Sequence, residues 1–204
     1  MNEWRERLAR WFSPLARHCP LSPNAITLVA LAINLVAATF LANGSREPWL
    51  FLASVALITV GGLADAFDGI VARVQGKTSR FGDFLDHCAD RLSDTFLGAG
   101  WLMGNDVRQP LLVAAIVLIM MNGYIGTQIE ATYRHRSYEA VGRGEFVLAL
   151  VALPILSYIL YSNGWQSFTA GTLTVAEWFA VLMITVAVLG IGQRVRKAWS
   201  LEQS

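Results

Sequence analysis

Residues 61–94 read GGLADAFDGIVARVQGKTSRFGDFLDHCADRLSD, and they join the end of one apolar run to the start of the next. Carboxylates at the boundary of a membrane are costly unless they are paired or bound to a cation. Asp65 and Asp68 are three residues apart, and Asp86 and Asp90 are four apart, so each pair lies on one face of its own helix. Two such helices side by side would bring four carboxylates together at one end of a helix bundle.

The composition around this segment is that of a membrane protein. Of the 204 residues, 54% are hydrophobic and 15% are charged, and the mean hydropathy is +0.45. Soluble domains carry about 25% charged residues. A net charge of +1 gives no reason to expect a nucleic acid as a partner. Two cysteines are too few for a disulfide scaffold. We therefore expect an all-α integral membrane protein.

Six apolar runs predict six transmembrane helices, because each approaches the roughly 20 residues that span the hydrocarbon core. Ser22 and Pro23 predict the start of the first helix as its N-cap and first residue. Pro154 predicts a kink in the fifth. The six runs cover residues 25–41, 49–72, 82–103, 111–128, 146–161 and 173–191.

Before the first run, aromatic and leucine residues recur at helical spacing, with arginines between them. This pattern predicts an amphipathic helix over residues 2–18 that lies in the membrane interface, with its arginines toward anionic headgroups. The composition of this helix favours a simple membrane anchor over a helix that helps to form a lipid entry site. Because no linker or repeat follows, we expect a single domain over residues 1–204. Its parts are the juxtamembrane helix at 2–18, a six-helix core at 22–192 and a cytoplasmic tail at 193–204.

The basic residues are distributed unequally between the two ends of this bundle. With six spans both termini lie on one side, and that side would hold thirteen of the sixteen Lys and Arg residues. The opposite side would hold Arg46 and Arg108, while Arg91 falls within the third span. The positive-inside rule therefore predicts cytoplasmic termini and a cytoplasmic aspartate cluster.

The aspartate cluster predicts a metal site. Mg²⁺ and Mn²⁺ prefer oxygen ligands. Gly69 and Gly82 let a ligand come close to the backbone, and Arg73 offers a guanidinium one turn after Gly69. Together these groups favour binding of a diphosphate. An ion-pair network that only holds helices together is the alternative interpretation. His87 points about 100° away from Asp86 around a helix, so we expect it to make a structural polar contact.

The pattern Asp65-x2-Asp68-Gly69-x2-Ala72-Arg73-x8-Gly82-x3-Asp86-x3-Asp90 resembles the signature of the CDP-alcohol phosphotransferase family at every fixed position. The resemblance implies a six-helix membrane enzyme of phospholipid synthesis. Such an enzyme transfers a substituted phosphoryl group from a CDP-linked donor to an alcohol and releases CMP. It also implies a location in a prokaryotic inner membrane.

The resemblance further implies a role for each matched residue. Asp65, Asp68, Asp86 and Asp90 would bind two divalent ions, and Asp90 would also be the general base. Helix capping alone explains Pro23 equally well. The implied contacts of the CDP donor are Pro23, Asn24, Thr27, Gly69, Arg73, Ser79 and Gly82.

The acceptor alcohol is less determined. Residues 79–94 look most like the prokaryotic inositol-phosphate branch, which joins CDP-diacylglycerol or a related CDP donor to a phosphorylated inositol. The Glu- and Arg-rich segment typical of that branch is reduced here to residues 142–146, so amino-alcohol and glycerol-phosphate acceptors stay open. Arginines are also expected beside spans from topology alone. The candidates for binding an acceptor phosphate are Arg134, Arg136, Arg143 and Arg194.

A non-enzymatic cation carrier is the alternative from another class. A carrier would place its charges near the bilayer midplane in both halves of the chain, whereas these aspartates lie at one boundary. Gly100 and Gly104 form a Gly-x3-Gly step that indicates either close helix packing or a homodimer contact.

Overall fold

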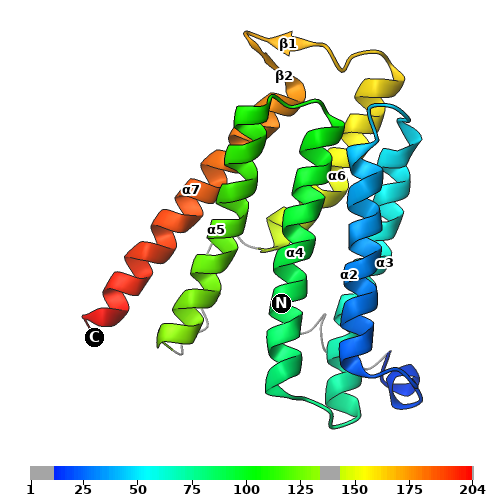
Figure 1. Ribbon diagram of the computed structural model, residues 1–204, viewed down its shortest axis with the longest axis vertical. Coiled ribbons are helices and arrows are strands. Elements are labelled where there is room, and N and C mark those ends of the chain that lie inside the picture. Colours follow the sequence, from blue (N-terminus) through cyan, green and yellow to red (C-terminus); the bar gives the residue numbers. More distant parts are fainter. Residues whose placement is uncertain (1–11, 134–142, 204) are drawn as a thin grey trace.

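The computed structural model describes residues 12–133 and 143–203, with the side chains of residues 143–147 left out. Six long helices run alongside one another in these residues (Figure 1). An antiparallel pair of two-residue strands, β1 (Thr169–Ala170) and β2 (Leu173–Thr174), precedes the last helix. The helices are α2 (Pro23–Ala42), α3 (Trp49–Val74), α4 (Arg80–Gly104), α5 (Gln109–Tyr133), α6 (Arg143–Ser162) and α7 (Val175–Glu202).

Each predicted span coincides with one of these helices. Within the described residues, α2, α3, α5 and α7 are long and apolar enough to cross a membrane. The first half of α4 carries the aspartates, and α6 contributes a shorter apolar helix over Leu148–Ser162. Over residues 12–133 and 143–203 the chain is therefore all-helical, apart from one small hairpin, and has four clear candidate spans. Pro154 lies inside α6 as expected.

The start of the sixth predicted span is wrong, because residues 173 and 174 belong to β2. The Thr174 hydroxyl accepts a hydrogen bond from the Glu177 backbone N–H at 3.2 Å, and the Glu177 carboxylate accepts one from the Thr174 N–H at 2.9 Å. This capping box begins α7 at Val175. At the other end α7 continues to Glu202, so most of the predicted tail is helical.

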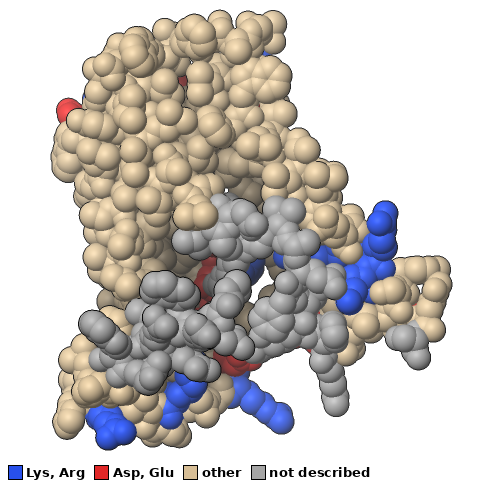
Figure 2. Space-filling model, turned by 180° about the vertical axis from the view of Figure 1, so that it is seen from behind, with Lys and Arg blue, Asp and Glu red and all other residues tan. Residues whose placement is uncertain are grey.

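The helices form a bundle with two unlike ends. Helix α2 packs against α3 and α4, α5 packs against α4 and α7, and α6 packs against α3. The hairpin lies at one end, called here the hairpin end, and the α3–α4 loop lies at the other, called the basic end (Figure 1). Figure 2 shows Lys and Arg gathered toward the basic end, below a largely uncharged surface.

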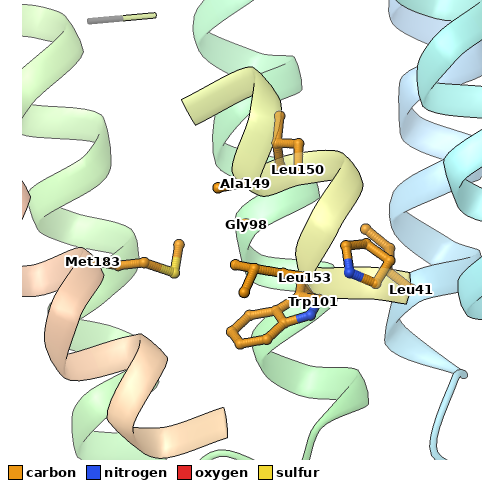
Figure 3. Close-up of a pocket in the computed structure, with 8 residues that line it drawn as sticks. Leu41, Gly98, Trp101, Ala149, Leu150, Leu153 and Met183 are labelled. Atoms are coloured by element: carbon orange, nitrogen blue, oxygen red, sulfur yellow. The ribbon is translucent and has the colours of Figure 1, made fainter. Parts of the chain in front are cut away.

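Glycines let α2 and α4 approach closely. Gly100 lies against the backbone of Ala38, and Gly104 lies against the backbone of Leu41, so that an added Cβ would overlap their carbonyl oxygens. The Gly-x3-Gly step therefore serves packing within one chain. Further along, a small pocket between α4, α6 and α7 is lined by apolar side chains such as Trp101 (Figure 3).

The described part of the N-terminal segment is anchored to α3. Residues 12–17 are helical, and Ala16 is fully buried. The rings of Phe12 and Phe67 meet edge to face, with their centroids 6.0 Å apart. The Gln75 side-chain amide donates to the carbonyl oxygens of Ala16 at 2.8 Å and Cys19 at 3.0 Å. Residues 2–11 of the predicted juxtamembrane helix lie outside the described residues.

An ion pair joins the starts of α5 and α7 at the hairpin end. Arg108 donates to the Glu177 carboxylate through Nε at 2.5 Å and through Nη2 at 3.2 Å. Glu177 is only 4% exposed, so its charge depends on this guanidinium and on the cap of α7.

We expect Arg108→Ala to lower the free energy of unfolding by about 2–3 kcal/mol, because it leaves a buried carboxylate without its cation. The measurement is the thermal midpoint of the purified protein in detergent. Arg46→Ala, which removes an exposed arginine at the same end, is the control and should change the midpoint little. Equal midpoints for the two variants would contradict this role of the ion pair.

Candidate active site

The α3–α4 turn brings the aspartates together. Gly76 has a φ of +65°, a conformation that glycine adopts without strain. The Ser79 hydroxyl then accepts a hydrogen bond from the Gly82 N–H at 3.0 Å and begins α4. The end of α3 and the start of α4 therefore lie beside each other at the basic end (Figure 1).

Two overlapping sets of side chains at this end could hold metal ions. One ligand oxygen from each of Asp65, Asp68 and Asp86 lies within 4.8 Å of the other two. Ligand atoms of Asp86, His87 and Asp90 form a second set with the same spacing. Asp68 is 6% exposed and Asp90 is 8% exposed, so these two carboxylates have little water to solvate them. An all-carboxylate set, and a carboxylate set with one imidazole, both fit a divalent cation.

A third helix supports this cluster. Thr27 on α2 is buried, and its hydroxyl donates to Asp68 Oδ2 at 2.5 Å. The sequence resemblance assigned Thr27 to the donor, and that contact stays a prediction. In the structure the Thr27 hydroxyl lies against the carbonyl oxygen of Pro23, at 3.1 Å, and against a candidate metal ligand. A hydrogen bond of this kind fixes the orientation of a carboxylate.

The predicted diphosphate residues lie on the same two helices. A Cβ added to Gly69 would lie 3.5 Å from Arg73 Nη1, so the exposed guanidinium folds back over this glycine. A Cβ added to Gly82 would lie 3.2 Å from both Asn24 Oδ1 and Ser79 Oγ. The starts of α2 and α4 therefore meet at Gly82.

Capping accounts for part of the predicted donor set. Pro23 is the first residue of α2, and the Ser22 hydroxyl accepts a hydrogen bond from the Ala25 N–H at 3.2 Å. Ser79 caps α4 in the same way. The capping prediction for Ser22 and Pro23 is confirmed, and the ligand contact of Pro23 stays a prediction.

Four arginines are predicted to bind the acceptor, and the structure describes the side chain of one of them, Arg194. This half-buried residue on α7 donates from Nη1 to Asn122 Oδ1 on α5, and its guanidinium lies over Gly126. Arg134 and Arg136 lie outside the described residues. Arg143 is the first residue of α6, and its side chain is not described.

Two residues near the cluster had no predicted role in the site. Arg91 packs against Gly123 of α5, and its Nη2 lies 3.6 Å from Asp94 Oδ2. An arginine within a span was the available signal, since such residues are rarely there by chance. His87 Nε2 lies 4.0 Å from Asp83 Oδ2, which agrees with the structural polar contact predicted for this residue. His87 also reaches Asp86 and Asp90, which helix periodicity did not indicate.

Comparisons with known proteins give a consistent result. The family model for CDP-alcohol phosphatidyltransferase matches residues 20–191. The chain is 31% identical over 184 residues to the archaetidylinositol phosphate synthase of Aeropyrum pernix, covering 86% of this chain and 87% of the relative. It is 28% identical over 211 residues to the phosphatidylinositol phosphate synthase of Mycobacterium marinum, covering 96% of this chain and 82% of the relative.

Solved structures share the fold. The phosphatidylinositol phosphate synthase of Mycobacterium tuberculosis with CDP-DAG bound aligns with a TM-score of 0.72 at 23% identity, over 93% of this chain and 94% of that chain. The same enzyme in complex with manganese and citrate aligns with a TM-score of 0.69 at 22% identity, over 96% and 88%. The family's use of divalent metal agrees with the carboxylate sets described above.

We expect Asp68→Asn to weaken Mn²⁺ binding about tenfold or more, because it removes a buried negative charge from the first set. Electron paramagnetic resonance on purified protein, without donor or acceptor, measures the free Mn²⁺. Asp83→Asn is the matched control, since Asp83 is a 61% exposed aspartate on α4 that belongs to neither set. Unchanged Mn²⁺ affinity in Asp68→Asn would remove this residue from the metal site.

Proposed function

Because the chain belongs to the CDP-alcohol phosphatidyltransferase family, we propose that it transfers the phosphatidyl group of CDP-diacylglycerol to an inositol phosphate. Membership of the family makes it an enzyme that moves a substituted phosphoryl group from a CDP-linked donor to an alcohol. The observation that carries the choice of acceptor is similarity over most of the chain to phosphatidylinositol phosphate and archaetidylinositol phosphate synthases. The structural observation behind the chemistry is the pair of carboxylate sets that share Asp86.

The first set would bind one divalent ion through Asp65, Asp68 and Asp86. The carboxylates of the second set, Asp86 and Asp90, would bind the other ion, with His87 beside them. When bound, Mg²⁺ or Mn²⁺ supplies positive charge that neutralises the diphosphate as CMP departs. Asp90 accepts the proton of the acceptor hydroxyl as its oxygen attacks the phosphorus that carries diacylglycerol. The new P–O bond forms to the acceptor, the P–O bond to CMP breaks, and CMP leaves with that electron pair.

The donor would lie across the starts of α2 and α4. Arg73 binds the diphosphate with its planar guanidinium, which already lies over Gly69. Gly82 keeps the space beside Asn24 free of a side chain, where the nucleotide would bind. Ser79 and Pro23 shape this region as the N-cap of α4 and the first residue of α2, and Thr27 acts through Asp68.

The acceptor phosphate would bind to arginines near the basic end. Arg194 is half buried between α7 and α5, where a charged group is costly without an anionic partner. Arg134, Arg136 and Arg143 complete the proposed acceptor site. If the acceptor is an amino alcohol instead, this extra positive charge has no phosphate to bind.

The same proposal sets the protein in the membrane. All six helices would span it as one domain, with an interfacial helix over residues 2–18 and with both termini and the site in the cytoplasm of a prokaryote. The basic end in Figure 2 supports this orientation through the positive-inside rule. A homodimer is compatible with it. Reporter fusions at the two termini test the orientation, and reporters on opposite sides would contradict it.

We expect purified protein with Mg²⁺ and CDP-diacylglycerol to release CMP when inositol phosphate is supplied. Serine, glycerol phosphate and amino alcohols, offered in turn, are the comparison. Arg194→Gln should raise the KM of inositol phosphate about tenfold or more while leaving the KM of the donor unchanged, because a charge-assisted contact to phosphate is lost. CMP release with glycerol phosphate or an amino alcohol alone would move the protein to another branch of the family.

We expect Asp90→Asn to abolish turnover while leaving appreciable binding of the CDP donor, because asparagine keeps one ligand oxygen but cannot accept the proton. Arg73→Lys should mainly weaken donor binding rather than turnover, even though the charge is kept, because lysine lacks the planar guanidinium. Calorimetric titration with donor and Mg²⁺, beside a single-turnover CMP assay, separates the two effects. Near-normal turnover in Asp90→Asn would exclude this residue as the base, and unchanged donor affinity in Arg73→Lys would exclude the guanidinium contact.

A further inference from the structure

A polar side chain on α2 lies between the two helices that carry the aspartates. Asn34 donates from Nδ2 to the hydroxyl of Ser93 on α4 at 3.1 Å. Its Oδ1 faces Gly61 on α3, where an added Cβ would overlap it. Among the residues that the structure describes, this buried oxygen has no hydrogen-bond partner. Asn34, Gly61 and Ser93 are called here the polar clamp.

The polar clamp lies one helical turn from the candidate metal ligands. Gly61 precedes Asp65 by four residues, and Ser93 follows Asp90 by three, so each lies on the same face of its helix as the aspartate. Asn34 follows Thr27 by seven residues, which is two turns of α2. Helix α2 therefore contacts the aspartate-bearing helices at two levels, through Thr27 with Asp68 and through Asn34 with both α3 and α4.

Packing alone does not account for an asparagine at this place. A buried carbonyl without a partner opposes folding, and an apolar side chain of similar size would fill the same space without that cost. The Asn34 amide makes a specific contact with each of the two helices. Its nitrogen donates to Ser93 on α4, and its oxygen fits against α3 only where that helix has a glycine. Such a contact fixes the distance and the register between two helices.

We propose that Asn34 is a positioning residue that holds α3 and α4 at the spacing that metal binding by Asp65, Asp68, Asp86 and Asp90 requires. It touches neither donor nor acceptor and acts through the helices that carry the carboxylates. This role rests on the metal site of the proposed function, although it is independent of which alcohol is the acceptor.

Two adjacent glycines on α3 provide the matched comparison. In Gly61→Ala the new methyl group collides with the Asn34 amide. In Gly62→Ala, apart from the backbone of its own helix and its chain neighbours, the methyl group meets no atom of the described residues within 4 Å. Both substitutions replace a helical glycine with alanine, so their effects on helix propensity are equal. We expect Gly61→Ala to weaken Mn²⁺ binding about tenfold, within the range for residues that orient metal ligands. Gly62→Ala should keep a Mn²⁺ affinity within about twofold of that of the unmodified protein, because its methyl group does not touch Asn34.

Asn34→Leu separates positioning from stability. Leucine fills the space but makes no hydrogen bond, so the thermal midpoint in detergent should stay the same or rise while Mn²⁺ affinity falls about tenfold. Ser93→Ala, a smaller change, should also lower Mn²⁺ affinity. It provides the test if Asn34→Leu does not fold. Mn²⁺ binding is measured by paramagnetic resonance on purified protein without substrates.

Asp68→Asn in the same titration distinguishes the failures. If Asp68→Asn loses Mn²⁺ while the substitutions at Asn34, Ser93 and Gly61 bind it normally, the positioning role is wrong and the metal site stands. If Asp68→Asn also binds Mn²⁺ normally, the metal site and the positioning role fall together. A loss of Mn²⁺ affinity in Gly62→Ala equal to that in Gly61→Ala would likewise overturn the positioning role.

Discussion

Repulsion between carboxylates is the constraint on which this structure depends. Oxygens of Asp65, Asp68 and Asp86 lie within 4.8 Å of one another at the basic end of the bundle, and the face seen in Figure 2 is largely uncharged away from that end. Charges of one sign at this separation repel strongly where water is scarce. The helices must therefore be held together by other contacts until a cation binds. Those contacts come mainly from α2, which packs against both α3 and α4.

The contacts of α2 change in kind along its length. Near the basic end they include a polar contact, in which the Thr27 hydroxyl donates to Asp68, beside apolar packing of Ile26 with Ile70 and Val71. Near the hairpin end they are backbone contacts, because Gly100 and Gly104 let α4 lie directly against α2. Close packing at one end leaves the other end free to be shaped by hydrogen bonds. The bundle thus combines a closely packed apolar part with a charged end.

Helices α5 and α7 form a second unit that meets the first through α4. Two glycines on α5 differ in their contacts from Gly100 and Gly104 on α4, because they lie against side chains. Gly123 makes room for the side chain of Arg91, and Gly126 makes room for that of Arg194. The same residue type therefore brings backbones together in one place and accommodates a long cation in another. At the hairpin end, the Arg108–Glu177 pair fixes the start of α5 relative to α7.

Much of this protein is determined by local sequence. Apolar runs of membrane length predicted six helices, since an apolar segment in lipid must satisfy its backbone hydrogen bonds within itself. The spacing of Asp65, Asp68, Asp86 and Asp90 predicted one face on each of two helices, and the distribution of basic residues predicted two unlike ends. The hairpin before α7 was missed, because two-residue strands have too little periodicity to detect.

Only the tertiary structure decided which groups support the aspartates. The contacts of Thr27 with Asp68 and of Asn34 with Ser93 join residues 41 and 59 positions apart, and no periodicity within one helix encodes such a distance. His87 likewise joins a ligand set that its position on the helix did not indicate. Helical spacing specifies the direction of a side chain about its own axis. The neighbour that it meets depends on how the helices pack, and that packing is set by close contacts at small residues such as Gly61 and Gly100.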